Sequence, residues 1–140
     1  MIPAAKPLIG EDEARAASEV IKSGMLAQGK KVAEFEEGFG KFIGAKHTIA
    51  MGNGTQAVHV ALLAAGVKRG NEVITTAFSF LASSTSIVHC GAKPVFSDID
   101  PKTFNMDPDD VRKLITPKTK AIMPVHLFGL SSDVKELLKI

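Results

Sequence analysis

A glycine-rich stretch, MGNGTQA, stands between a short apolar run and a long alanine-rich run. Residues 47–51 before it suit a β-strand, whereas residues 55–65 are almost wholly apolar and favour a helix. A helix start carries N–H groups without partners in the helix, and the positive end of the helix dipole. Gly52 and Gly54 would let an anion approach the backbone there. The stretch is therefore a candidate phosphate site.

Two other interpretations stay open on these residues alone. Asn53 and Gly54 would also form a tight turn, with Thr55 capping the helix and no ligand needed. Residues 52–57 also fit the dinucleotide-binding pattern G-x-G-x-x-G/A. That pattern requires an acidic residue about 20 positions further on, whereas residues 75–78 here read TTAF. Nicotinamide and flavin dinucleotides are therefore less favoured than other ligands that carry a phosphate group.

The composition is that of a globular chain with a sizeable core. Of the 140 residues 45% are hydrophobic, the formal net charge is +2, and lysines and glutamates are scattered. No basic or aromatic surface typical of nucleic-acid binding stands out, and no apolar run has the length of a signal peptide or a membrane span. The single cysteine, Cys90, is expected to be a buried thiol. These features predict a cytoplasmic protein that binds neither nucleic acid nor a membrane.

The hydrophobic pattern predicts two leading helices and then an alternation of strands and helices. Apolar residues at helical spacing favour helices over residues 11–22 and 31–43, and the phenylalanines of the second are expected in the core. The later strands are apolar on both faces, which is typical of a parallel sheet between helices. Strands are expected at residues 47–51, 72–76, 94–98 and 120–125, and helices at residues 55–65, 81–89, 108–115 and 132–139. The predicted fold class is α/β, with a mostly parallel sheet flanked by helices.

Ligands of such a sheet gather where its strands end. Those ends would present residues 52–56, residues 76–80, Asp98, Asp100 and His126. The two aspartates could act as metal ligands or acid–base groups, but a carboxylate beside a turn usually bonds to its own backbone. His126 has no second ligand at metal spacing, so no metal site is predicted.

Four blocks in order resemble the DegT/DnrJ/EryC1/StrS family of pyridoxal-phosphate-dependent sugar aminotransferases. They are S-G-x-x-x-x-G-x-x-V-x-x-F-E at residues 23–36, the G-x-G-T-x-A loop, EVITTAFSFLASS at residues 72–84 and KAIMPVHLFG at residues 120–129. The similarity covers nearly the whole chain. It implies the large domain of a fold-type I enzyme, with residues 1–30 as an N-terminal helix and loop and residues 31–140 as the first part of the cofactor-binding domain.

The resemblance also implies which residues bind the cofactor, pyridoxal 5′-phosphate. Gly54, Thr55 and Gln56 would hold its phosphate through backbone N–H groups and the threonine hydroxyl. Phe80 would stack on its ring, with Phe78 as the alternative if the alignment shifts by two residues. Either ring could instead simply pack beneath the sheet.

The implied partners follow from the family's activity. Its members transfer an amino group, commonly from glutamate, to a keto-sugar carried on a nucleotide, and they work as dimers. A nucleotide-linked sugar, an amino-acid donor and a second copy of the chain are therefore expected. The loop at residues 23–29 lies near the sugar-nucleotide site in this family, which implies binding roles for Met25, Leu26 and Gln28. A plain connector between helices is the alternative.

No residue of the chain matches the family's catalytic lysine, which forms a Schiff base with the cofactor and moves a proton. The resemblance puts that lysine beyond residue 140. The chain is therefore expected to be the N-terminal part of an aminotransferase, truncated at its C-terminus and inactive by itself. The alternatives are a sugar dehydratase of the same family, in which histidine replaces the lysine, and a non-catalytic fragment that serves as a binding or interaction module.

Overall fold

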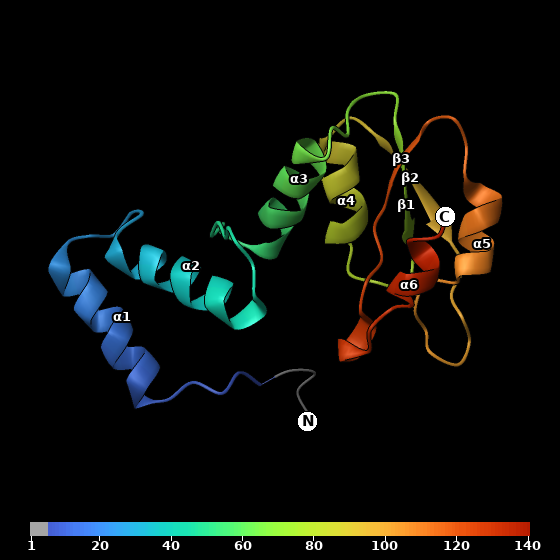
Figure 1. Ribbon diagram of the computed structural model, residues 1–140. Helices are drawn as coiled ribbons and strands as arrows, with labels where there is room; N and C mark the ends of the chain where they lie inside the picture. The colour runs from blue at the N-terminus through green and yellow to red at the C-terminus, as the bar shows by residue number, and fades with distance from the viewer. Residues whose placement is uncertain (1–5) are drawn as a thin grey trace. The chain divides into compact units, whose positions relative to one another are not determined.

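The structure, a computed structural model, describes residues 6–140 and divides into two compact units, Met1–Ala50 and Met51–Ile140 (Figure 1). The first is named the helical unit here, because it holds the helices α1 (Glu11–Ser23) and α2 (Lys30–Ile43). The second is named the sheet unit, because its helices surround three β-strands. The domain boundary that the sequence predicts, after residue 30, stays a prediction.

In the helical unit, local sequence features determine where each helix begins and ends. α1 opens with three acidic residues, whose charges suit the positive end of a helix dipole. Gly24 and Gly44 end the two helices with φ of 72° and 70°, a region that glycine adopts without strain. The helices predicted over residues 11–22 and 31–43 are confirmed. Neither these helices nor any other in residues 6–140 has the length and the apolar character needed to cross a bilayer.

The strand predicted at residues 47–51 is wrong. This segment has no regular secondary structure, and among residues 6–140 no strand pairs with it. Its backbone is tied to α2 instead, because the Glu36 carboxylate accepts the amide of Ala50 at 2.8 Å and the Thr48 hydroxyl donates to the Glu36 carbonyl. A side-chain acceptor thus takes an N–H that a sheet would otherwise have to pair.

The sheet unit is built on three parallel strands in the order β2–β1–β3. The strands are β1 (Glu72–Thr76), β2 (Lys93–Ser97) and β3 (Thr119–Ile122). The helices are α3 (Gly54–Ala64), α4 (Ala82–His89), α5 (Pro108–Leu114), α6 (Val134–Leu137) and a short 3-10 helix, η1 (Leu127–Gly129). Figure 1 shows α3 and α4 on one side of the sheet and α5 and α6 on the other. The predicted α/β arrangement is confirmed.

Two apolar clusters, one on each face of the sheet, hold these layers together. Neighbouring residues of a strand point to opposite faces, so Val73 of β1 enters one cluster and Ile74 the other. Val73 shares its cluster with Leu62 of α3 and Ile87 of α4, and Ile74 shares the second with Val111 of α5. Val73 and Ile74 are fully buried. The central strand is therefore the core of the sheet unit.

Cys90 belongs to the first of these clusters and follows directly after α4. Its side chain is buried, and this burial raises the pKa of the thiol. The buried thiol that the sequence predicts is confirmed.

The last two elements are shorter than the sequence predicts. β3 ends at Ile122 instead of residue 125, although the amide of the next residue, Met123, still donates to the carbonyl of Ile74 at 2.8 Å. The helix predicted over residues 132–139 is reduced to α6, a single turn. Its N-cap, Asp133, accepts the amide of Glu136 at 3.1 Å.

Candidate functional site

Three loops and one helix N-terminus lie at the carboxyl edge of the sheet (Figure 1). The strands are parallel, so the loops that follow β1, β2 and β3 leave from the same edge. α3 leads into β1 from the opposite edge, which places its own N-terminus at the carboxyl edge. The Ser86 hydroxyl of α4 donates to the carbonyl of Thr55 at 3.3 Å and so ties the start of α3 to α4. This edge is where sheets of this kind bind ligands.

The start of α3 is held by two short-range hydrogen bonds. Asn53 is the N-cap, and its Oδ1 accepts the amide of Gln56 at 2.9 Å. The Gln56 side chain folds back, and its Oε1 accepts the amide of Gly52 at 3.1 Å. Among residues 6–140, nothing pairs with the amides of Gly54 and Thr55 or with the Thr55 hydroxyl. These three donors are the groups available to an anion.

The two glycines of this turn serve different needs. A Cβ at Gly52 would lie 2.6 Å from Oε1 of Gln56, so the folded-back side chain requires glycine at this position. A Cβ at Gly54 would meet no heavy atom within 4 Å, so the backbone there is open to solvent. An open backbone with unpaired amides at a helix N-terminus fits a phosphate group. Gln56 would contribute its amide only by giving up the cap.

Phe80 and Phe78 lie on the loop after β1 and have different surroundings. Phe80 is 80% exposed and lines a pocket of about 270 Å³ together with Thr76 and Phe96. The Phe78 ring packs against Phe104, with ring centroids 5.9 Å apart. Phe80 is therefore the ring available to a ligand, whereas Phe78 is engaged by the protein.

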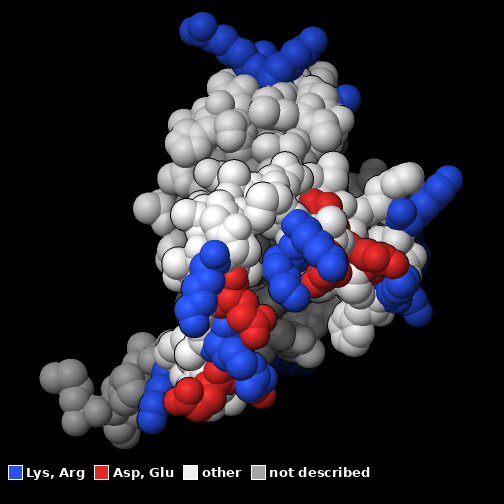
Figure 2. Space-filling model, turned by 90° about the vertical axis from the view of Figure 1, so that its left-hand side faces the viewer, with Lys and Arg blue, Asp and Glu red and all other residues white. Residues whose placement is uncertain are grey.

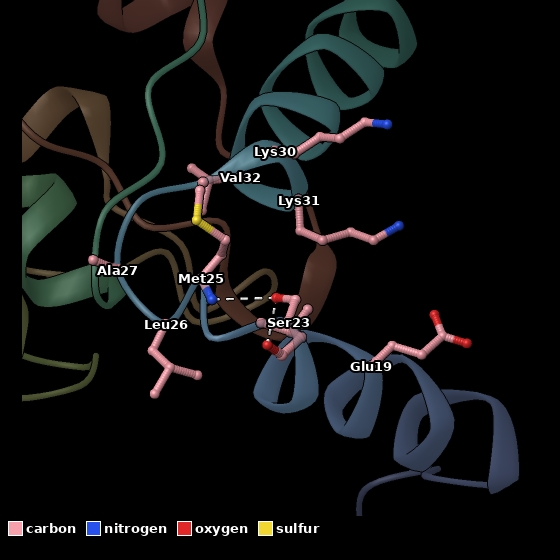
Figure 3. Close-up of a pocket in the computed structure, with 10 residues that line it drawn as sticks. Glu19, Ser23, Met25, Leu26, Ala27, Lys30, Lys31 and Val32 are labelled. Carbon is pink, nitrogen blue, oxygen red and sulfur yellow. Dashed lines mark hydrogen bonds between the residues drawn. The ribbon is translucent and has the colours of Figure 1, made fainter.

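The loop at residues 23–29 joins α1 to α2 and lines a pocket of about 440 Å³ within the helical unit (Figure 3). Met25 and Leu26 form part of its wall, whereas Gln28 does not line it. The Ser23 hydroxyl accepts the amide of Met25 at 3.2 Å and holds the start of the loop in place. The other apolar lining residues are Val20, Ala27 and Val32.

The charged side chains around this pocket balance one another. Figure 3 shows Lys30 and Lys31 extending from α2 and Glu19 from α1. The Glu34 carboxylate lies 3.8 Å from Nζ of Lys30 and 2.9 Å from Nζ of Lys31, and the hydrogen bond to Glu34 raises the pKa of Lys31. In the lower half of Figure 2, basic and acidic side chains likewise lie next to one another. The pocket thus offers apolar contact rather than a net positive field.

The polar residues that the sequence places after β2 and β3 are used by the backbone. Oδ1 of Asp98 accepts the amide of Ile99 at 2.8 Å, and Oδ1 of Asp100 accepts that of Lys102 at 2.6 Å. His126 accepts the amide of Ser132 at Nδ1, over 3.0 Å. The neutral His126 ring therefore carries its proton on Nε2.

Two residues of the loop after β2, Phe104 and Asn105, have structural roles that the sequence did not indicate. Phe104 adopts φ of 59°, which is rare for an aromatic residue. Asn105 is buried and bonds to the backbone of the loop after β3 at two points. Neither feature has a periodic or motif signal, so the sequence alone could not have revealed them.

Comparison with known proteins identifies the chain at family level. The sequence model of the DegT/DnrJ/EryC1/StrS aminotransferase family matches residues 7–140. The chain belongs to this family. The resemblance carried by the four sequence blocks is confirmed.

Individual relatives of the DegT/DnrJ/EryC1/StrS family agree with this assignment. The chain is 43% identical to the spore coat polysaccharide biosynthesis protein SpsC of Bacillus subtilis, over 99% of this chain and 36% of SpsC. It is 48% identical to the GDP-perosamine synthase of Caulobacter vibrioides, over 80% of this chain and 30% of the synthase. The chain thus spans about a third of the length of the curated relatives it matches.

A solved structure of similar fold also carries a bound cofactor. NtdA of Bacillus subtilis, solved with bound cofactor PMP, superimposes with a TM-score of 0.88 at 36% identity, over 94% of this chain and 31% of NtdA. The predicted fold class, part of the large domain of a fold-type I enzyme, is confirmed.

Proposed function

We propose that this chain is the N-terminal part of a pyridoxal-phosphate-dependent aminotransferase that acts on a nucleotide-linked keto-sugar, with glutamate as amino donor. The observation that carries the proposal is the pair of unpaired amides at Gly54 and Thr55, at the same sheet edge as the exposed ring of Phe80. NtdA binds PMP, the amino form of pyridoxal phosphate, and the Caulobacter relative is named for a nucleotide sugar. Both similarities support the proposal.

The start of α3 binds the phosphate of the cofactor. The amides of Gly54 and Thr55 and the Thr55 hydroxyl donate to phosphate oxygens, and the positive end of the helix dipole adds to the attraction. Asn53 keeps the helix start in shape through its bond to the amide of Gln56. Gln56 in turn holds Gly52, so the turn is ordered before the phosphate arrives.

Phe80 provides the surface on which the cofactor ring rests. An aromatic ring that is already exposed gives up few contacts within the protein when it stacks on a ligand, and it excludes water from one face of that ligand. When bound, pyridoxal phosphate acts as the electron sink for the transfer of the amino group. Phe80 orients the ring of the cofactor, and the phosphate site anchors the cofactor.

Met25, Leu26 and Gln28 contact the sugar nucleotide, and the protein works as a homodimer. Met25 and Leu26 lie in the apolar wall of the 440 Å³ pocket, which would accept a planar ring or the apolar face of a sugar. In full-length protein, Met25→Ala and Gln28→Ala should raise the KM for the sugar nucleotide more than the KM for glutamate. Equal effects on both substrates would indicate a general loosening of the loop.

The cofactor proposal is tested by a charge change at Gly54 in full-length protein. Gly54→Asp puts a negative charge beside the phosphate, and Gly54→Asn serves as the neutral control of the same shape. The site has room for either side chain, and an acid in the first turn suits a helix, so the fold should persist. Thr55→Val, which removes only the hydroxyl, should weaken binding less.

The expected result is a loss of pyridoxal phosphate affinity of tenfold or more for Gly54→Asp, and a much smaller loss for Gly54→Asn. Pyridoxal, which lacks the phosphate, should bind the wild-type protein, Gly54→Asp and Gly54→Asn with the same affinity. Binding is followed by equilibrium dialysis and by absorbance of the bound cofactor. An unchanged dissociation constant for Gly54→Asp would show that the phosphate binds elsewhere.

A further inference from the structure

The turn that follows β2, at residues 100–106, contains a residue in an unfavourable backbone conformation. Phe104 has φ of 59°, a region that aromatic residues rarely occupy because Cβ approaches the backbone too closely. Its side chain is half exposed, so burial does not explain the choice of residue. Backbone strain of this kind persists only where the surrounding structure imposes it, and it concentrates at functional sites.

Hydrogen bonds on both sides of Phe104 impose this conformation. The Phe104 amide donates to the carbonyl of Asp100 at 2.7 Å, and Oδ1 of Asp100 accepts the amides of Lys102 and Thr103 at 2.6 and 3.1 Å. The amide of Asp100 in turn donates to the carbonyl of Asn105 at 2.9 Å. The turn is therefore closed by hydrogen bonds that do not involve the Phe104 side chain.

The next residue anchors the turn to the loop after β3. Asn105 is 3% exposed, and its Nδ2 donates to the carbonyl of Leu130 at 3.1 Å. Its Oδ1 accepts the amide of Leu127, also at 3.1 Å. Phe104 thus extends from a turn that is fastened to a second loop of the carboxyl edge.

On its other side, Phe104 reaches the loop after β1. Its ring packs against Phe78, with ring centroids 5.9 Å apart and an angle of 48° between the planes. The amide of Phe78 donates to the Thr76 hydroxyl at 3.2 Å, and the Ser79 hydroxyl donates to the Thr76 carbonyl at 3.1 Å. The segment is therefore a tight turn, and Phe104 supports the side of it that carries Phe78. Phe80 follows two residues later.

We propose that Phe104 is a positioning residue, which acts through Phe78 to hold the Phe80 ring where it stacks on the cofactor. The inference rests on the proposed function, because it requires a cofactor ring at Phe80. It explains why an aromatic side chain is kept at a strained and half-exposed position. Without the Phe104 ring, the turn after β1 loses its lateral support and Phe80 samples other orientations.

Substitutions of Phe104 in full-length protein test the proposal, with cofactor affinity and stability measured separately. Phe104→Gly removes the ring and relieves the positive φ, and Phe104→Asn does the same with a residue that tolerates this region. Both should raise the dissociation constant for pyridoxal phosphate about three- to fivefold. The urea midpoint should change little, because relief of strain offsets the lost contact. Phe104→Tyr keeps the ring and should bind pyridoxal phosphate with wild-type affinity.

A double-mutant cycle with Phe80→Ala identifies the route of the effect. If Phe104 acts through Phe80, Phe104→Gly adds no further loss of affinity once Phe80 is alanine. The visible circular dichroism of the bound cofactor should weaken in Phe104→Gly as it does in Phe80→Ala. Additive losses, or an unchanged dissociation constant in both Phe104→Gly and Phe104→Asn, would overturn the inference.

The proposed function has its own separate point of failure. If Phe80→Ala and Gly54→Asp both leave cofactor affinity unchanged, the proposed cofactor site is wrong and the inference falls with it. If those two variants lose affinity and the Phe104 variants do not, only the positioning role is wrong.

Discussion

The helical unit and the sheet unit differ in what the apolar side chains of their helices meet. In the sheet unit, residues from four helices and the central strand form two buried clusters. In the described part of the helical unit only Gly40 is buried, and Phe42 of α2 is 87% exposed. The expectation that the α2 phenylalanines enter a core is therefore wrong within residues 6–140. An amphipathic pattern predicts a helix but does not supply the surface that covers it.

The difference has a simple physical origin. A sheet offers two flat apolar faces, and each helix laid on it buries a stripe against several strands at once. Two helices joined by a short loop form no such apolar face, and isolated helices of this length are marginal in water. In α2, Phe35 and Phe39 stack on each other at 5.7 Å, which covers only part of each ring. Helices of this kind gain most of their stability from a partner surface.

The largest expected effect comes from comparing a large apolar side chain of the sheet unit with one of the helical unit. Ile74→Ala in β1 removes a fully buried side chain and should lower the free energy of unfolding by about 2 to 5 kcal/mol. Phe42→Ala in α2 removes a larger side chain, yet an exposed one, and should change stability by no more than about 0.5 kcal/mol. Urea denaturation followed by circular dichroism measures both. A loss at Phe42 as large as that at Ile74 would mean that the α2 face is covered in the protein.

A smaller effect separates the ways in which the two units start their helices. In the sheet unit, Asn53 caps α3 with its side chain, whereas Gly10 caps α1 without one. Asn53→Ala should therefore cost about 1 kcal/mol. Asn53→Asp, which keeps the acceptor oxygen, should cost much less. Gly10→Ser should raise stability by a few tenths of a kcal/mol, since a Cβ there meets only Glu13 at 3.6 Å. Equal losses for the two Asn53 variants would contradict the capping role.

The sequence predicted most of the fold because local signals determine most of it. Asp107 followed by Pro108 marks a helix start, and the structure has Asp107 as the N-cap of α5, accepting the amide of Asp109 at 2.9 Å. The parallel strands follow from apolar runs separated by helices. The strand predicted at residues 47–51 is absent because an apolar run becomes a strand only beside a partner strand. The Glu36 carboxylate accepts the amide of Ala50 instead.

The candidate site was predictable in outline and not in detail. Gly54 and Thr55 lie at the helix start that the glycine pattern predicts, but the cap is Asn53 rather than Thr55. That choice depends on a single local hydrogen bond that several arrangements could satisfy. The support of Phe78 by Phe104 joins residues 26 positions apart through a strained backbone, and no periodic pattern encodes it. Contacts of this kind become visible only once the loops are placed.

The smallest expected effect concerns the polar groups that a core buries. The sheet unit encloses several hydroxyls, and most find a partner. The Thr75 hydroxyl donates to the carbonyl of Met123 at 3.0 Å. The Ser97 hydroxyl is 4% exposed as a residue and has no partner within residues 6–140. A buried hydroxyl without a hydrogen bond has lost its water without replacement, so it does not stabilise the fold.

Ser97→Ala should therefore leave the free energy of unfolding unchanged or raise it slightly, whereas Thr75→Val should lower it by about 1 kcal/mol. The two residues lie on adjacent strands, and each substitution removes one hydroxyl from a buried position. Thr75→Val fills the space with a methyl group, whereas Ser97→Ala leaves it empty. The urea midpoints of both variants in full-length protein measure the difference.

If Ser97→Ala loses as much stability as Thr75→Val, the Ser97 hydroxyl has a partner in the full-length protein. A ligand at the carboxyl edge would then be a candidate for that partner, because Ser97 is the last residue of β2. Repeating the Ser97→Ala measurement with saturating pyridoxal phosphate and without it distinguishes a ligand from a protein group.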